Sequence, residues 1–143
     1  MTVKAILSRK KSAVVTIEPG ASLADAARML ADRRIGAVII IGAGERVAGL
    51  LSERDIVQTL ADKGAAALSL TVGEVMTRRV VTCVAADTVG ELMERMTNGK
   101  FRHVPVVEDD RLVGIVSIGD IVKYRLEEME AESSAMREYI ATA

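Results

Sequence analysis

Two short motifs hold the side chains best suited to bind a ligand. The sequence GLLSERD at residues 49–55 returns as GIVSIGD at residues 114–120. In both copies an aspartate follows a serine by three positions, giving the pairs Ser52 with Asp55 and Ser117 with Asp120. Each pair comes directly after a short apolar run, where a helix is expected to begin. Two interpretations of these pairs are open.

The simpler interpretation is a capping box, in which the serine caps the helix and the aspartate bonds back to the serine N–H. The other is a ribose-phosphate site. A helix N-terminus offers free N–H groups and a favourable dipole to a phosphate, and an aspartate one turn into the helix can accept from two vicinal hydroxyls. The glycine that opens each motif would let a ligand approach the backbone closely.

The two motifs close the two copies of an internal repeat. The serines are 65 positions apart, and earlier matches, such as VVT at residues 14–16 with VVT at residues 80–82, are 66 apart. A fixed period of this kind indicates two copies of one supersecondary unit. Hydrophobic patterns predict strands at residues 13–17, 37–41, 47–51, 80–84, 104–107 and 112–116, with helices capped by Ser22, Ser52, Thr88 and Ser117.

A repeat of this order, closed by Gly-x-x-Ser-x-x-Asp, resembles the cystathionine-β-synthase (CBS) domain family. The tandem pair looks like a Bateman module, the usual folded unit of that family. The resemblance implies an α/β fold of two β-α-β-β-α repeats with pseudo-twofold symmetry, back-to-back sheets and an added C-terminal helix. The expected boundaries are residues 12–63 for the first repeat, 64–75 for a linker, 76–126 for the second repeat and 127–143 for the C-terminal helix.

The resemblance also implies that adenine nucleotides bind between the repeats. AMP is the first candidate, followed by ADP, ATP and NAD(H), with S-adenosylmethionine ranked below them. In the family each site is built across the pair, so that the Asp120 site would draw on Thr16 and the Asp55 site on Thr82. The expected binding residues are Thr16, Gly36, Ala37, Ser52, Arg54, Asp55, Thr77, Thr82, Arg102, His103, Pro105, Ser117 and Asp120.

The two copies differ at positions where the ligand would lie. Arg102 and His103 replace a glycine and an alanine of the first copy, and Arg54 stands where the second motif has a glycine. Arg102 could clamp phosphate through its planar fork or be a solvated surface side chain. His103, the only histidine, is expected to line a cleft and not to catalyse a reaction. We therefore expect unequal sites, with the Asp120 site binding AMP-like ligands more tightly.

Composition argues against several other functions. The formal net charge of the 143 residues is −1 and aromatic residues make up 2%, so neither a basic stripe nor base-stacking platforms for nucleic acid are expected. The single Cys83 excludes an internal disulfide. No apolar run reaches the length of a membrane span, which predicts a soluble cytoplasmic protein without a membrane partner.

An enzyme is not expected either. One histidine and one cysteine cannot make a metal cluster, no Gly-rich Walker loop is present, and no nucleophile with a positioned base is evident. The resemblance instead implies a regulatory sensor of adenine nucleotides with no chemistry of its own. Without an effector domain it would have to act on another protein, which the sequence does not identify. The alternative is a structural or interaction protein whose clefts hold no physiological nucleotide.

Both ends of the chain extend beyond the repeat. Arg9, Lys10 and Lys11 near the N-terminus form either a basic surface turn or, by the resemblance, a contact for phosphate at the mouth of a site. At the other end an apolar stripe follows the heptad spacing of a coiled coil, either to pack on its own domain or to meet a partner helix. Its members are Val122, Leu126, Met129, Ser133, Met136 and Ile140. The stripe and the family resemblance together predict a homodimer.

Overall fold

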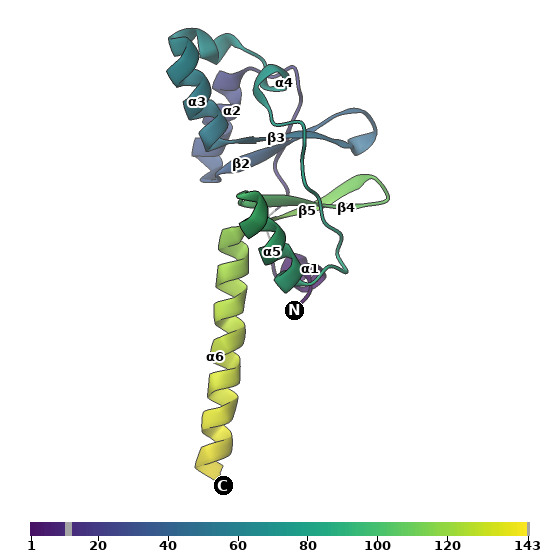
Figure 1. Ribbon diagram of the computed structural model, residues 1–143, viewed down its shortest axis with the longest axis vertical. Helices are drawn as coiled ribbons and strands as arrows, with labels where there is room; N and C mark the ends of the chain where they lie inside the picture. The colour runs from purple at the N-terminus through teal and green to yellow at the C-terminus, as the bar shows by residue number, and fades with distance from the viewer. Residues whose placement is uncertain (11–12, 143) are drawn as a thin grey trace.

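The protein consists of two α/β repeats and one long C-terminal helix (Figure 1). The computed structural model describes residues 1–10 and 13–142. Lys11 of the basic N-terminal segment, residue 12 and residue 143 lie outside the described residues. In Figure 1 the two sheets lie one above the other at the middle of the molecule, and the long helix leads away from them.

The first repeat contains a three-stranded sheet in the order β1-β2-β3. Strand β2 pairs parallel with β1 and antiparallel with β3. The elements are β1 (Thr16–Ile17), α2 (Leu23–Arg33), β2 (Ala37–Ile41), the short 3-10 helix η1 (Ala43–Glu45), β3 (Val47–Ser52) and α3 (Glu53–Lys63). The predicted first strand, residues 13–17, is thus confirmed only at its last two residues.

The second repeat follows a helical connection and contains the antiparallel pair β4-β5. The connection holds the 3-10 helix η2 (Gly64–Ser69) and the short helix α4 (Val72–Val75). The repeat itself is made of α5 (Val89–Gly99), β4 (His103–Glu108), β5 (Arg111–Ser117) and α6 (Ile118–Thr142). The remaining helix, α1 (Val3–Arg9), precedes the first repeat.

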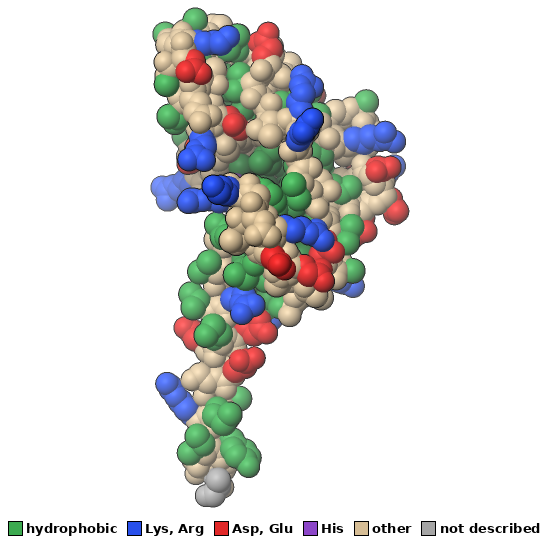
Figure 2. Space-filling model, viewed as in Figure 1, with side chains coloured by type: hydrophobic (Ala, Val, Ile, Leu, Met, Phe, Trp, Pro, Cys, Tyr) green, Lys and Arg blue, Asp and Glu red, His purple; other side chains and the backbone are tan. Residues whose placement is uncertain are grey.

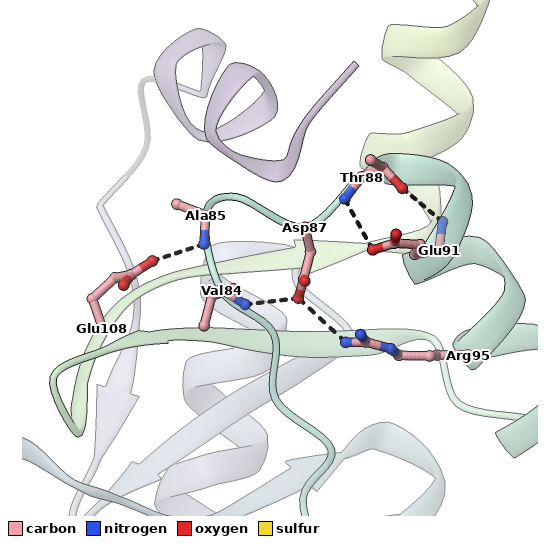
Figure 3. A network of polar contacts seen from close by, with 7 residues as sticks. All are labelled: Val84, Ala85, Asp87, Thr88, Glu91, Arg95 and Glu108. Carbon is pink, nitrogen blue, oxygen red and sulfur yellow. Dashed lines mark hydrogen bonds and ion pairs between the residues drawn. The ribbon is translucent and has the colours of Figure 1, made fainter.

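The strand predicted at residues 80–84 is reduced to one bridge, between Cys83 and Val106. Cys83 keeps its bonds to β4, donating to the Pro105 carbonyl at 3.0 Å and accepting from the Val107 N–H at 2.9 Å. After it, side chains become the acceptors: Asp87 accepts a hydrogen bond from the Val84 N–H at 3.0 Å, and Glu108 accepts one from the Ala85 N–H at 2.8 Å (Figure 3). The single bridge still matches the parallel pairing of Ile17 with Ile40 in the first repeat.

Pro105 lies in β4, as predicted for a strand edge with a missing donor. Its carbonyl accepts from the Cys83 N–H at 3.0 Å, so the side of Pro105 that lacks an N–H faces this short outer segment and not β5. The proline therefore breaks no bond of the β4-β5 ladder.

Helix caps follow the sequence closely. Helix α3 ends at a glycine, Gly64 (φ 63°), whereas α2 and α5 end at residues of other types. Ser22, Ser52 and Thr88 cap α2, α3 and α5 through their side chains, and Thr88 forms a full capping box with Glu91. The left-handed residues that end α2 and α5 are Arg34 (φ 54°) and Lys100 (φ 57°). Gly99 is the last residue of α5 and not its left-handed end residue. The left-handed backbone angle, which glycine adopts most easily, therefore falls on a basic residue in both repeats.

Each repeat has its own apolar core, and each core is completed by a segment from outside the repeat. Val3 and Ile6 of α1 are fully buried in the core of the second repeat, beside Leu92 and Val104. Ala67 and Val72 of the helical connection are buried in the core of the first repeat. The two repeats are therefore interlocked, because the chain crosses from one to the other twice.

Candidate functional site

Two clefts lie where the repeats meet, each at one of the Ser/Asp motifs. The Asp120 cleft encloses about 830 Å³ and the Asp55 cleft about 750 Å³. Gly36, His103 and Ser117 line both clefts. The polar walls of the Asp120 cleft also include Lys10, Arg33, Arg34 and Asp120. Those of the Asp55 cleft also include Ser52, Glu53, Arg54, Asp55, Thr77, Arg79, Lys100 and Arg102.

The backbone holds the two motifs in the same way. Ser52 pairs with Ala37 across β2 and β3, and Ser117 pairs with His103 across β4 and β5. One residue later, the Glu53 N–H donates to the Gly36 carbonyl at 2.9 Å, and the Ile118 N–H donates to the Arg102 carbonyl at the same distance. Each motif helix is thereby fixed against the start of the neighbouring strand.

Both motifs form capping boxes, which confirms the simpler interpretation of the sequence. The Ser52 N–H donates to Asp55 Oδ2 at 2.9 Å, and the Asp55 N–H donates to Ser52 Oγ at 3.3 Å. The corresponding distances for Ser117 and Asp120 are 2.9 and 3.1 Å.

The capping bonds use only one oxygen of each carboxylate. The hydrogen bonds that the carboxylates of Asp55 and Asp120 accept from the part of the chain that the structure describes all end on Oδ2. Each Oδ1 therefore keeps its capacity to accept from a ligand in the cleft. The two interpretations of the motif are compatible, because cap and ligand would use different oxygens.

Lys10 distinguishes the Asp120 cleft from its counterpart. Its Nζ donates to Asp120 Oδ2 and to the Ile115 carbonyl, both at 2.8 Å, and about a fifth of each side chain of the ion pair is exposed. Burial alone would raise the pKa of Asp120, but the hydrogen bonds from Lys10 and the Ser117 N–H, with the Lys10 charge, hold this pKa below its usual value. The residue 66 positions after Lys10 is Met76, so Asp55 has no lysine at the corresponding place.

Arg102 lies in the Asp55 cleft, not beside Asp120 as the sequence led us to expect. His103 lines both clefts, with Gly36 opposite: a Cβ built on Gly36 would lie 3.6 Å from His103 Cε1. Burial lowers the pKa of His103, although the carboxylates of Asp120 and Glu53 act in the opposite direction. His103 is therefore mainly neutral at pH 7 and can donate or accept at the boundary of the two clefts.

The remaining predicted residues divide between the clefts and the body of the protein. Ala37 lines the Asp120 cleft, and Arg54 and Thr77 line the Asp55 cleft. The segments expected to cross between repeats do so, since residues 13–15 line the Asp120 cleft and residues 79–81 the Asp55 cleft. Thr16, Thr82 and Pro105 line neither cleft: the two threonines are exposed elsewhere and Pro105 is buried in β4.

Sequence reasoning missed several basic side chains at the clefts. Arg33 and Arg34 line the Asp120 cleft, and Arg79 and Lys100 line the Asp55 cleft. Arg34 and Lys100 occupy equivalent positions in the two repeats, a signal that the sequence offers. Figure 2 shows Lys and Arg side chains gathered where the two repeats meet, beside the start of α6.

The glycine that opens each motif has a different role from the one expected. A Cβ on Gly49 would lie 2.6 Å from Met76 Sδ and 2.8 Å from the Thr77 carbonyl. A Cβ on Gly114 would lie 2.6 Å from Leu7 Cδ2. Both glycines thus admit other segments of the protein itself, and Gly114 in addition lines the Asp120 cleft.

Across residues 1–10 and 13–142, no group of three or more His, Cys, Asp or Glu side chains is placed to hold a metal ion. No helix in the described part of the chain is both long and apolar enough to cross a membrane.

Comparison with known proteins relates this arrangement to one family. The CBS domain model matches residues 3–62 and 72–127. Among curated proteins, the chain is similar to the CBS domain-containing protein CBSX3, mitochondrial, of Arabidopsis thaliana, with 32% identity over 120 residues that make up 81% of this chain and 58% of CBSX3. It is similar to CBSCBSPB2 of the same plant, with 29% identity over 83% of this chain and 22% of the relative. The chain thus spans less than two thirds of these relatives.

Solved structures are similar over most of their length. The CBS-domain containing protein ATU1752 from Agrobacterium tumefaciens has 48% identity and a TM-score of 0.84, covering 87% of this chain and 99% of that one. The CBS domain pair of protein MJ0100, crystallised with 5′-methylthioadenosine and S-adenosyl-L-methionine, has 29% identity and a TM-score of 0.79, covering 90% and 98%. Since the family model matches both repeats and both motifs are in place, the chain belongs to the CBS domain family.

Proposed function

We propose that this CBS pair is a regulatory module that binds an adenosine-containing ligand and passes the bound state on to a partner protein. The observation that carries this proposal is the free Oδ1 of Asp55 and of Asp120, each at a helix N-terminus in a cleft. Such an oxygen suits the vicinal hydroxyls of a ribose, and the helix N-terminus suits a phosphate. The related MJ0100 pair, which holds two adenosine compounds, supports the same ligand class.

Charge favours a phosphorylated ligand within that class. The Asp120 cleft carries Lys10, Arg33 and Arg34 against one carboxylate, and the Asp55 cleft carries Arg54, Arg79, Lys100 and Arg102 against Glu53 and Asp55. Both clefts are therefore net positive, which attracts the phosphates of AMP, ADP, ATP or NAD(H) and disfavours the sulfonium cation of S-adenosylmethionine. AMP remains the first candidate.

The clefts should bind this ligand unequally, in the reverse order to the one that the sequence suggested. No lysine among residues 1–10 and 13–142 bonds to Asp55, and Arg102 lies in its cleft. In the other cleft the charge of Lys10 already neutralises part of the Asp120 carboxylate, which makes its Oδ1 a weaker acceptor for a ribose hydroxyl. We expect the Asp55 cleft to fill first.

Catalysis by the chain itself is not part of the proposal. Cys83 is the only cysteine, and its side chain is buried. Burial, with the charge of Asp87, raises the pKa of its thiol to about 11, so the nucleophilic thiolate is scarce at neutral pH. His103 lies in the clefts and Cys83 does not, so the two cannot act together.

We propose further that the module works as a homodimer. Val57 and Val122 follow the two motifs at equivalent positions and are 63% and 51% exposed. Figure 1 shows α3 and the start of α6 on the same side of the molecule. Exposed valines at matching positions of both repeats suit a shared surface that a second copy would cover.

Calorimetric titration tests the ligand proposal. AMP, ADP, ATP, NAD+ and NADH should bind with two unequal sites, and S-adenosylmethionine should bind more weakly. Asp55→Ala should weaken the stronger site roughly 10- to 150-fold, the equivalent of a lost hydrogen bond to a charged group. Glu91→Ala is the matched control, since it removes a capping-box carboxylate that lines neither cleft.

A 2′-deoxy ligand sharpens the assignment. It should bind the wild type less well than AMP, yet Asp55→Ala should add little further loss, because the bond is already missing. Equal losses in both backgrounds would show that Asp55 does not hold the 2′-hydroxyl. If no adenosine compound binds at millimolar concentration, the alternative of a structural or interaction protein with empty clefts replaces this proposal.

A further inference from the structure

Helix α6 carries an apolar stripe, from Val122 to Ile140, that the described part of the chain leaves largely exposed. Its apolar members are between 51% and 66% exposed: Val122, Leu126, Met129, Met136 and Ile140. Figure 2 shows hydrophobic side chains along the whole length of this helix. The alternative that the stripe packs on its own domain is thus answered in part: every apolar member is at least half exposed, although Met129 borders a hollow with Met1 and Val89 of the body.

The helix contacts the body of the protein through another face. Its buried side chains are Ile121 and Tyr124. Neither belongs to the stripe: at 3.6 residues per turn, Ile121 lies roughly 100° and Tyr124 roughly 160° around the helix from its centre. Covering the stripe therefore requires no change in how α6 packs on its own repeat.

The heptad spacing assigns the charged residues beside the stripe. Val122, Met129 and Met136 take position d, and Leu126, Ser133 and Ile140 take position a. The flanking e positions are then Lys123, Glu130 and Arg137, and the g positions are Arg125, Glu132 and Tyr139. The side chains at all six of these e and g positions are exposed.

A parallel pair of these helices would match opposite charges. In a parallel coiled coil, position g of one helix faces the following position e of its partner. Arg125 would then face the partner's Glu130, and Glu132 would face the partner's Arg137, and symmetry repeats both pairs. The polar Ser133 at position a would meet its own copy and favour this register.

An antiparallel pair would match like charges. With the stripes fully overlapped, e positions face e positions and g positions face g positions. Glu130 and Glu132 would each face their own copies, and Lys123 would face the partner's Arg137. The charge pattern therefore discriminates between the two directions.

We propose that α6 pairs in parallel with α6 of a second copy of this chain. The pairing specifies the surface and the direction of the proposed homodimer. It places the second repeat of one copy beside the second repeat of the other, with Val122 as the stripe residue closest to the body. Because it rests only on α6, it can fail while the homodimer and the ligand proposal both stand.

Charge reversal at Arg137 tests the direction. In the parallel pair, Arg137→Glu faces Glu132 twice, so the dimer dissociation constant measured by sedimentation should rise roughly 3- to 30-fold. The double variant Arg137→Glu with Glu132→Arg should restore it. In the antiparallel pair the same single change would face Lys123 and tighten the dimer, which would overturn the proposal. Glu138→Arg, on the outer face of the same turn, is the control and should change nothing.

Cross-linking gives an independent readout. Met136→Cys should form an intermolecular disulfide on mild oxidation, because two d positions meet in a parallel pair. An antiparallel pair with full overlap would hold these two residues roughly 15 Å apart, beyond the reach of a disulfide. Glu138→Cys is the matched control and should cross-link poorly. A dimer in which Met136→Cys does not cross-link, or a monomer at micromolar concentration, would overturn parallel α6 pairing.

Discussion

Replacing Asp120 by alanine should cost more stability than replacing Asp55. Asp55→Ala removes a capping box, a change that typically costs roughly 0.5 to 2 kcal/mol. Asp120→Ala removes the same cap and also the Lys10 contact at 2.8 Å, whose two side chains are 19% and 20% exposed. A hydrogen bond between charged groups adds roughly 1.5 to 3 kcal/mol at so sheltered a position. The free energy of unfolding should therefore fall by roughly 2 to 5 kcal/mol for Asp120→Ala.

Urea unfolding and thermal melting at pH 7.5 without ligand measure this difference. The extra loss should lower Tm by roughly 3 to 12 °C more for Asp120→Ala than for Asp55→Ala. Lys10→Met, which copies the Met76 of the other repeat, should cost little when added to Asp120→Ala because the ion pair is already broken. Lys10→Met and Asp55→Ala should instead be additive.

The difference in unfolding free energy between Asp120→Ala and Asp55→Ala should depend on pH, and the pKa of Asp120 gives its sign. Because the pKa of Asp120 is lowered by folding, its contribution is fully present above the unfolded value near 3.9 and is lost as pH falls through the lower folded value. The gap between the two alanine variants should therefore close in acid. Equal losses for both variants at pH 7.5, or additive effects of Lys10→Met and Asp120→Ala, would refute the reasoning.

Two further predictions concern a matched glycine pair and the single histidine. In urea titrations Gly49→Ala should lower the free energy of unfolding by roughly 1 to 3 kcal/mol, more than Gly114→Ala. The methyl group at position 49 would meet the Thr77 carbonyl, whereas the one at position 114 would meet the mobile end of the Leu7 side chain. A larger loss for Gly114→Ala would contradict this account of how the two glycines pack. His103 should titrate below 6.5 by NMR, so that stability declines as pH falls below 6.5; His103→Gln should flatten that decline.

The internal repeat made most of the fold predictable. Once residues 49–55 and 114–120 were aligned, the capping boxes followed from local chemistry, because Ser and Asp three positions apart interact within one turn. The buried strand at residues 37–41 followed from its continuous apolar run. These features depend on neighbours in the sequence, and they appear as predicted.

The features that sequence missed depend on distant or side-specific contacts. Lys10 meets Asp120 across 110 positions, and no local pattern announces that pairing. Arg102 directly precedes β4. The cleft that its side chain enters depends on the side of the backbone from which the side chain projects. The strand predicted at residues 80–84 keeps only the Cys83 bridge, and the bonds that follow it, from the Val84 and Ala85 N–H groups to Asp87 and Glu108, are contacts that a periodicity pattern does not contain.

The position of α1 has a consequence for how the protein is made. Its first residues bond to the segment that precedes α5: the Val3 N–H donates to the backbone carbonyl of Asp87, and the Lys4 N–H donates to that of Ala85. During synthesis, α1 emerges from the ribosome before the second repeat on which it packs. At synthesis rates of roughly 5 to 20 residues per second, the interval between the two lasts on the order of 5 to 20 seconds. During it, Val3 and Ile6 stay exposed on the nascent chain and are open to capture by a chaperone.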